Sequence, residues 1–127
     1  MSTINLNKGG SIIGTVDTTQ AAARDEASGT STAQGTAQNS AVQYFKSTGR
    51  GSGTFRYIRS FLQFDSSSIT SAVGAAVLNI ESEGTSDTAD VIVCASDAFG
   101  GASDDLINDD FNNVDFSTAY SGEVSTW

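Results

Sequence analysis

Two neighbouring segments with a two-residue periodicity constrain the fold of this chain more than any other feature. Residues 56–65 form an alternating segment in which Ile58, Leu62 and Phe64 lie opposite Arg59, Phe61 and Gln63. Residues 75–81 place Ala76, Leu78 and Ile80 opposite Asn79 and Glu81. Alternation with aromatic and branched side chains predicts strands that have one buried face. We therefore expect Leu62 and Phe64 to face the interior beside Leu78 and Ile80.

The rest of the chain predicts more strands and little helix. Further strands are expected over residues 4–6, 11–16, 42–45, 90–95 and 124–127, with a break at Gly9 and Gly10. The glycine-rich residues 47–54 predict a turn that joins residues 42–45 to residues 55–64 as a hairpin. Residues 17–43 are polar and of low complexity, which predicts a long surface excursion, and nothing apolar recurs to hold a helical turn at residues 21–27. A short helical turn is expected around residues 103–109, with Ser103 as its cap.

The chain is expected to form one domain. Its 127 residues are enough to bury a single core, and its one cysteine, Cys94, excludes an internal disulfide. Cys94 lies in a predicted strand, where a small buried thiol is expected. Residues 1–40 would supply N-terminal strands and an extended polar arm. Residues 41–127 would form the main sheet region, which is incomplete at its C-terminal end.

Charge is segregated along the chain. All six lysine and arginine residues precede residue 60, whereas most of the fifteen acidic residues follow it, and the net charge is −9. Nucleic acid is therefore not an expected partner, because phosphate binding needs a concentrated basic surface. Solubility explains the acidic half. The basic half predicts contacts with an acidic partner surface through four residues: Lys46, Arg50, Arg56 and Arg59.

No catalytic motif emerges. Gly49, Gly51 and Gly53 alternate, but a strand rather than a helix follows them, so they do not predict a phosphate loop. The chain has no histidine, and no pair of carboxylates has a recognisable glycosidase arrangement, so we expect a protein that is not an enzyme. No cofactor is expected, except that carboxylates in one loop suit Ca²⁺ as an alternative to a solvated acidic loop: Asp104, Asp105, Asp109 and Asp110.

Three aromatic residues suggest a second kind of site. Sugar-binding sites present aromatic faces beside polar groups, and Tyr57, Tyr120 and Trp127 are candidates for such faces. Each can equally be an aromatic of the core or its rim.

The start of the chain lacks the apolar run of a secretory signal, and the apolar runs are too short to cross a membrane. The composition nevertheless is that of an extracellular β protein. Synthesis in a host cytoplasm without a signal peptide, followed by release in a virus particle, satisfies both observations.

One part of the sequence resembles a known family. The run Arg59-Ser-Phe-Leu-Gln-Phe-Asp65, followed by Ser67, Ile69 and residues 76–80, resembles the DNRLRE-type β-sandwich domains. Such domains look like jelly-roll carbohydrate-binding modules and occur in bacterial surface proteins, and similar sequences occur in structural proteins of tailed phages, marine ones included. The resemblance covers about residues 40–95. The family's Pro-x-Gly loop is replaced here by Thr70–Gly74, and family members continue with further strands beyond residues 125–127.

The resemblance implies an all-β fold, an antiparallel jelly-roll-like β-sandwich with long Gly/Ser/Thr-rich loops. It implies that Arg59 and Asp65 fix a turn by pairing with the backbone or with each other. Either the chain is truncated or neighbouring subunits supply the missing edges, so a homo-oligomer is expected. The expected function is a non-enzymatic virion structural protein, a capsid decoration or head/tail fibre subunit that contacts other virion proteins such as the major capsid protein. The alternative is a carbohydrate-binding module of a tail fibre or cell-surface protein, which would bind host surface glycans.

Overall fold

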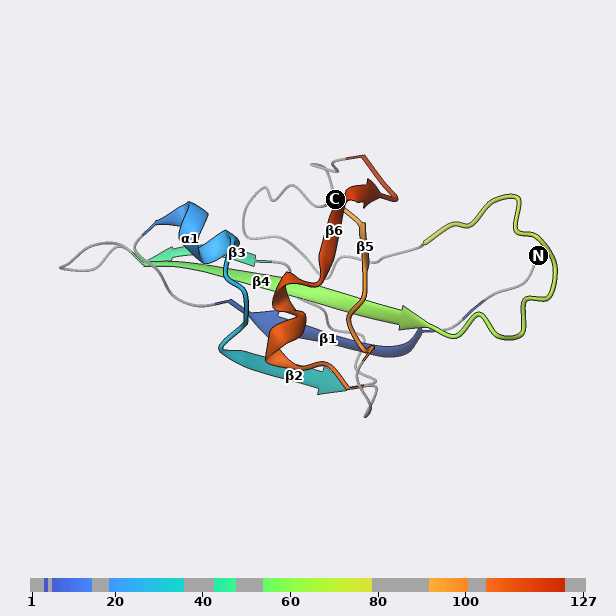
Figure 1. Ribbon diagram of the computed structural model, residues 1–127, viewed down its shortest axis with the longest axis horizontal. Helices are drawn as coiled ribbons and strands as arrows, with labels where there is room; N and C mark the ends of the chain where they lie inside the picture. The colour runs from blue at the N-terminus through green and yellow to red at the C-terminus, as the bar shows by residue number, and fades with distance from the viewer. Residues whose placement is uncertain are drawn as a thin grey trace.

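The computed structural model contains antiparallel sheets and almost no helix (Figure 1). It describes residues 4, 6–14, 19–35, 43–47, 54–78, 92–100 and 105–122, with the backbone alone for residues 43–47. The elements, in chain order, are β1 (Leu6–Ile13), α1 (Gln20–Arg24), β2 (Ser31–Gly35), β3 (Gln43–Ser47), β4 (Thr54–Phe64), β5 (Cys94–Ser96), the 3₁₀ helix η1 (Asn108–Asn112) and β6 (Val114–Ala119). The prediction of an all-β chain with antiparallel strands is confirmed at this level.

Four strands form the larger sheet in the order β2-β1-β4-β3, and every neighbouring pair is antiparallel. The predicted β3–β4 hairpin is confirmed by its register, in which Phe45 lies opposite Arg56. The predicted break at Gly9 and Gly10 is wrong. β1 runs through both glycines because β2 and β4 pair with them from either side, and its irregularity lies between Leu6 and Lys8.

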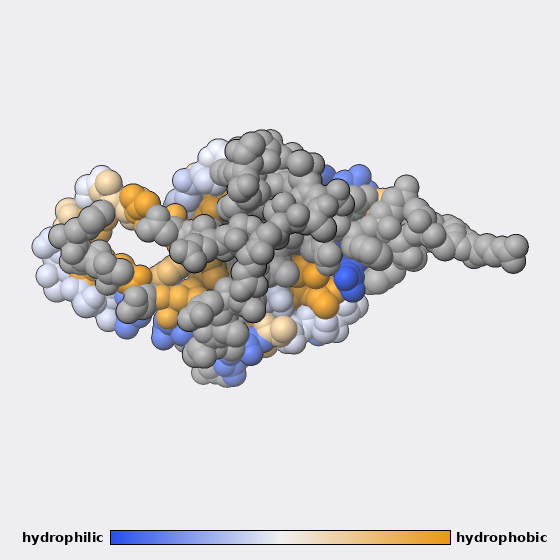
Figure 2. All heavy atoms as spheres, turned by 180° about the vertical axis from the view of Figure 1, so that it is seen from behind, coloured by the Kyte–Doolittle hydropathy of each residue, from blue (hydrophilic) through white to orange (hydrophobic). Residues whose placement is uncertain are grey.

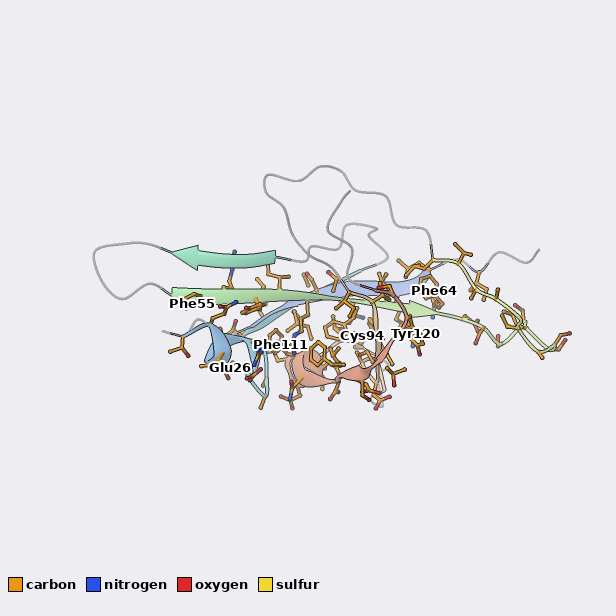
Figure 3. The ribbon with its side chains drawn as sticks, turned by 90° about the horizontal axis from the view of Figure 1, so that it is seen from above. Glu26, Phe55, Phe64, Cys94, Phe111 and Tyr120 are labelled. Atoms are coloured by element: carbon orange, nitrogen blue, oxygen red, sulfur yellow. The ribbon has the colours of Figure 1, made fainter. Side chains whose placement is uncertain are left out.

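The core lies on one face of this sheet, between β1, β4 and the segments that lead to η1. Its buried side chains come from five positions spread over the chain: Ile12, Phe61, Phe99, Leu106 and Phe111. Figure 3 shows Phe111 on the η1 side of the sheet. Gly14 allows the close approach, since a Cβ there would lie 2.5 Å from Cζ of Phe111. Burying such aromatic side chains is the main source of stability in a chain without a disulfide.

The expectation that Leu62 and Phe64 face the interior is wrong. Their side chains are 36% and 39% exposed, whereas Phe61, on the opposite face of β4, is 4% exposed. The core therefore forms on the Arg59 and Phe61 face, because Phe111 and Leu106 pack there. Leu62 and Phe64 remain partly accessible on the opposite face, and Figure 2, seen from behind, shows hydrophobic residues among the described atoms there.

Part of the predicted surface excursion is regular structure. α1 begins after Thr19, whose hydroxyl accepts a hydrogen bond from the Ala22 amide at 3.2 Å, and it buries Ala23. One buried alanine and a cap hold this single turn without an apolar periodicity. β2 then pairs with β1. The excursion expected over residues 17–43 is therefore corrected to a helix and an edge strand, with residues 17, 18 and 36–42 outside the described part.

The predicted strand at residues 75–81 is not found in its described part. After β4 the chain turns at Asp65, whose carboxylate accepts a hydrogen bond from the Ser67 amide at 2.9 Å. Residues 70–78 then run exposed and form no strand, and Figure 1 shows this segment extending away from the sheets. An alternating pattern gives no strand here because no described strand lies beside it to supply hydrogen bonds. Residues 79–81 lie outside the described part.

The smaller sheet pairs β5 with β6. The strand predicted over residues 90–95 begins only at Cys94 in the described part, and Cys94 is half-buried rather than fully buried. The predicted turn of helix is displaced toward the C-terminus, because the Ile107 amide donates to the Asp110 carboxylate and η1 begins after it. Ser103 and the strand predicted at residues 124–127 lie outside the described residues. Among the described helices, none is long and apolar enough to cross a membrane.

Candidate functional site

The structure distributes the predicted site residues over separate places. Arg59 and Tyr57 lie on the core side of β4, Tyr120 follows β6, and Asp109 and Asp110 belong to η1. Four further predicted residues fall on parts that the structure does not describe or describes by backbone alone: Lys46, Arg50, Asp104 and Trp127. No single site brings the described candidates together.

Arg59 connects three segments. Its Nη2 donates to the backbone carbonyl of Arg24 at 2.6 Å, and its Nη1 donates to the carbonyl of Phe111. The guanidinium also stacks over the Phe111 ring, 4.2 Å from the ring centre, and lies 5.6 Å from the centre of Phe116. The expected backbone hydrogen bonds of Arg59 are therefore present, but they join α1 and η1 to β4 instead of fixing a local turn with Asp65.

The electrostatics around Arg59 suit a cation held inside the fold. Burial lowers the pKa of the Arg59 guanidinium, and the nearby Asp25 opposes this shift. An arginine stays charged in proteins even so. The side chain of Arg24 holds Asp25 through a hydrogen bond of 2.6 Å, which lowers the pKa of the Asp25 carboxyl. The structure thus shows an intramolecular role for Arg59, and its contact with a partner stays a prediction.

The two described aromatic candidates differ in exposure. Tyr57 packs against the core, and its hydroxyl accepts a hydrogen bond from Gln20 Nε2 at 2.9 Å. The position of Tyr57 therefore agrees with the alternative prediction that it is an aromatic residue at the rim of the core. Tyr120 is 72% exposed, and its amide donates to the Val93 carbonyl, so its backbone is held while its ring remains accessible.

The aspartates around η1 have structural partners. Asp110 is 5% exposed, and its carboxylate accepts hydrogen bonds from the Ile107 amide at 3.0 Å and from Asn113 Nδ2 at 2.8 Å. Asp105 accepts a hydrogen bond from Gln34 at 2.8 Å. Among the described residues, no three acidic, histidine or cysteine side chains gather as a metal site would require. The calcium prediction involving Asp104 concerns a residue outside the described part.

Two shallow hollows were not foreseen from the sequence. The first, here named the β2-edge hollow, has a volume of about 370 Å³ and is lined by Thr32, Leu106, Ile107, Asn108 and Asp109. It lies beside β2, the strand at one end of the larger sheet. Because β2 and η1 are far apart in the chain, no local sequence pattern predicts this hollow.

The second, here named the β6 hollow, has a volume of about 310 Å³ and is lined by Ala95, Ser96, Asp97, Asn112, Asn113, Val114 and Asp115. Hydrogen bonds from Ser117 and Thr118 lower the pKa of Asp115, so its carboxylate is charged at neutral pH. Phe116, the next residue of β6, is 60% exposed. In the sequence, only the acidic character of this part of the chain pointed to the polar surface around the β6 hollow.

Comparison with protein-family models, with curated proteins and with solved structures finds no match to this chain. The geometry and the sequence therefore carry the functional argument.

Proposed function

We propose that the chain is a non-enzymatic structural subunit of a tailed-phage particle, either a capsid decoration or a head/tail fibre subunit. The observation that carries the proposal is the exposed apolar segment after β4, in which Val73, Val77 and Leu78 are 59%, 72% and 43% exposed. A soluble chain that leaves such side chains uncovered usually buries them against another protein. The partners proposed are further copies of this chain and other virion proteins such as the major capsid protein.

The sheet edges support the same proposal. In the described part of the larger sheet, β2 and β3 are the end strands, and each has a strand on one side only. An open edge pairs readily with another chain. We propose further that the two sheets belong to a jelly-roll-like sandwich that is completed in the assembly. The phage setting rests on the resemblance of residues 59–80 to domains found in phage structural proteins.

The native mass of the purified chain, measured by size exclusion with light scattering, tests self-assembly. Mass spectrometry and electron microscopy of purified phage particles test the location. We expect a discrete oligomer and a fixed number of copies per particle. A chain that is absent from particles would contradict the virion proposal, whatever its mass in solution.

A carbohydrate-binding module is the second candidate, and the β6 hollow favours it. Amide, hydroxyl and carboxylate groups line this hollow. The exposed Phe116 directly follows the lining residue Asp115, and the exposed Tyr120 follows the other end of β6. Aromatic rings beside polar groups are typical of sugar sites. A glycan array should then reveal one sugar class, and Tyr120→Ala should weaken its binding. If no glycan is retained, this candidate is rejected.

A further inference from the structure

The segment after β4 has the properties of a strand that lacks a partner. We call residues 66–78 the apolar arm. It contains no charged residue, and its last four residues, Ala75–Leu78, are all apolar and exposed. A Cβ on Gly74 would meet no atom within 4 Å, so the centre of the arm stands clear of the described chain. A short apolar run outside any regular element can adopt the extended conformation in which a segment joins a sheet.

The open edge of β2 is suited to receive such a strand. All four described side chains of β2, Ser31–Gln34, are exposed and uncharged, and β1 is its only strand neighbour in the described sheet. Edge strands that avoid pairing commonly carry charges, proline or a bulge. None of the charged residue types occurs in β2, and its register with β1 is regular from Gly9 to Ile13.

The β2-edge hollow adds a place for side chains next to this edge. Its floor includes Leu106, which is 4% exposed, and Ile107, which is 49% exposed. When an extended segment adds to a sheet edge, main-chain hydrogen bonds supply affinity, and pockets for alternate side chains supply specificity. The edge thus offers main-chain hydrogen-bonding groups, and the hollow offers two apolar side chains, Leu106 and Ile107, beside the polar Thr32, Asn108 and Asp109.

We propose that residues 75–78 of one copy add as a strand to the β2 edge of a second copy, with Val77 or Leu78 entering the β2-edge hollow. This inference rests on the self-assembly in the proposed function and names its contact. Four extended residues span about 13 Å, which fits within the about 17 Å that the five residues of β2 span.

Charge favours this occupant over other segments of the chain. Asp109 lines the hollow, so an acidic strand would be repelled there, whereas the nearby Asp105 is paired with Lys8 at 3.9 Å. The chain as a whole carries a net charge of −9, which opposes the approach of most of its surface to a second copy. The arm has no charge and therefore approaches the hollow without this penalty.

Disulfide trapping tests the contact. In a Cys94→Ser background, Ile107→Cys is combined with Val77→Cys or with Leu78→Cys and oxidised with diamide. At least one pair should give a covalent dimer on non-reducing gels, because two thiols in contact across the interface are oxidised to a disulfide as diamide is reduced. The matched control combines Ile107→Cys with Tyr120→Cys, since Tyr120 is as exposed as Val77 and should not link. Failure of both pairs, a link within one chain, or equal linking of the control would overturn the proposal.

Variants with an added charge give a second measurement. The arm variant Val77→Asp/Leu78→Asp should lower the native mass to that of the monomer, and so should Ile107→Asp in the hollow. Mixing the two variants should restore a heterodimer, because one intact arm and one intact edge remain. A Tyr120→Asp control should keep the wild-type mass. Circular dichroism of each variant separates lost pairing from lost folding.

These outcomes separate the inference from the proposed function. If the wild-type chain is an oligomer of fixed stoichiometry in particles and the arm variant keeps that oligomer, the arm-and-edge contact is wrong while the virion proposal stands. If the contact is trapped but the chain is absent from particles, the virion proposal is wrong while the contact stands.

Discussion

At the level of single residues, Arg59 joins parts of the chain that lie far apart in sequence. It reaches the carbonyl of Arg24 at the end of α1 and that of Phe111 in η1, and its guanidinium covers the Phe111 ring. A charged donor gives stronger hydrogen bonds than a neutral one, and Arg59 donates to two carbonyls at once. Arg59 is therefore expected to matter for stability more than the other arginines.

Replacing Arg59 by methionine tests this role. Arg59→Met keeps much of the aliphatic volume but removes both donors, so we expect the free energy of unfolding to fall by about 2 to 3 kcal/mol. Arg24→Met is the matched control, because the Arg24 side chain is exposed and bonded to the neighbouring Asp25, and its loss should leave the free energy of unfolding close to that of the wild type. Urea unfolding of both variants provides the comparison. Equal losses would show that Arg59 does not bridge the two carbonyls.

Gly14 has a different role, because it leaves room for an aromatic ring. A Cβ at this position would lie within 3.2 Å of three atoms of the Phe111 ring, which is itself fully buried. Gly14→Ala should therefore destabilise the protein by about 1 to 3 kcal/mol through overpacking. Gly74→Ala, where a Cβ meets nothing within 4 Å, should be neutral or slightly stabilising. Thermal unfolding of the two variants measures the difference, and a similar midpoint for both would contradict this packing.

At the level of elements, the sequence pattern predicted the features that depend on residues close together in the chain. The β3–β4 hairpin follows from two strand-forming runs and a glycine-rich connection, and it is present. The buried face of β4 was assigned wrongly because β4 carries apolar residues on both faces. The choice between Phe61 and Leu62 depends on Phe111, which comes from η1, far along the chain. The same limit applies to the β2-edge hollow, whose walls come from distant segments.

The carboxylate of Asp110 helps to determine where η1 begins. Two acidic pairs in one loop suggested calcium, yet Asp110 of the second pair points inward, where it accepts hydrogen bonds from the Ile107 amide and the Asn113 side chain. Asp109 is less buried than Asp110. Sequence alone does not distinguish the two neighbours, because both are aspartates at the start of a helical turn.

Substitution of each aspartate separates these roles. Asp110→Ala leaves the Ile107 amide and the Asn113 side chain without their acceptor, so the free energy of unfolding should fall by about 1 to 3 kcal/mol. Asp109→Ala removes the same charge from a more accessible position and should change it by less than about 0.5 kcal/mol. Chemical unfolding is the measurement, and a loss of equal size in both variants would argue against the capping role of Asp110.

At the level of the whole molecule, the charge distribution separates possible contact surfaces. All lysines and arginines precede residue 60, and β3 and β4 contain three of the four predicted partner contacts, Lys46, Arg56 and Arg59. Since Arg59 is engaged within the fold, we expect the proposed contact with an acidic virion protein to depend on Lys46, Arg50 and the half-buried Arg56. The acidic C-terminal half would then remain directed to solvent.

A triple substitution tests that expectation. Lys46→Gln/Arg50→Gln/Arg56→Gln removes three positive charges, and at about 0.5 kcal/mol for each ion pair lost with the partner the affinity for the particle should fall roughly tenfold. Binding of the wild-type chain should also weaken as salt rises above about 0.1 M, where screening acts over about 10 Å. Arg50→Lys/Arg56→Lys keeps the charge and should retain binding. Copies per particle are counted by quantitative mass spectrometry; occupancy that is unchanged in the triple variant, or insensitive to salt, would mean that this surface does not contact the partner.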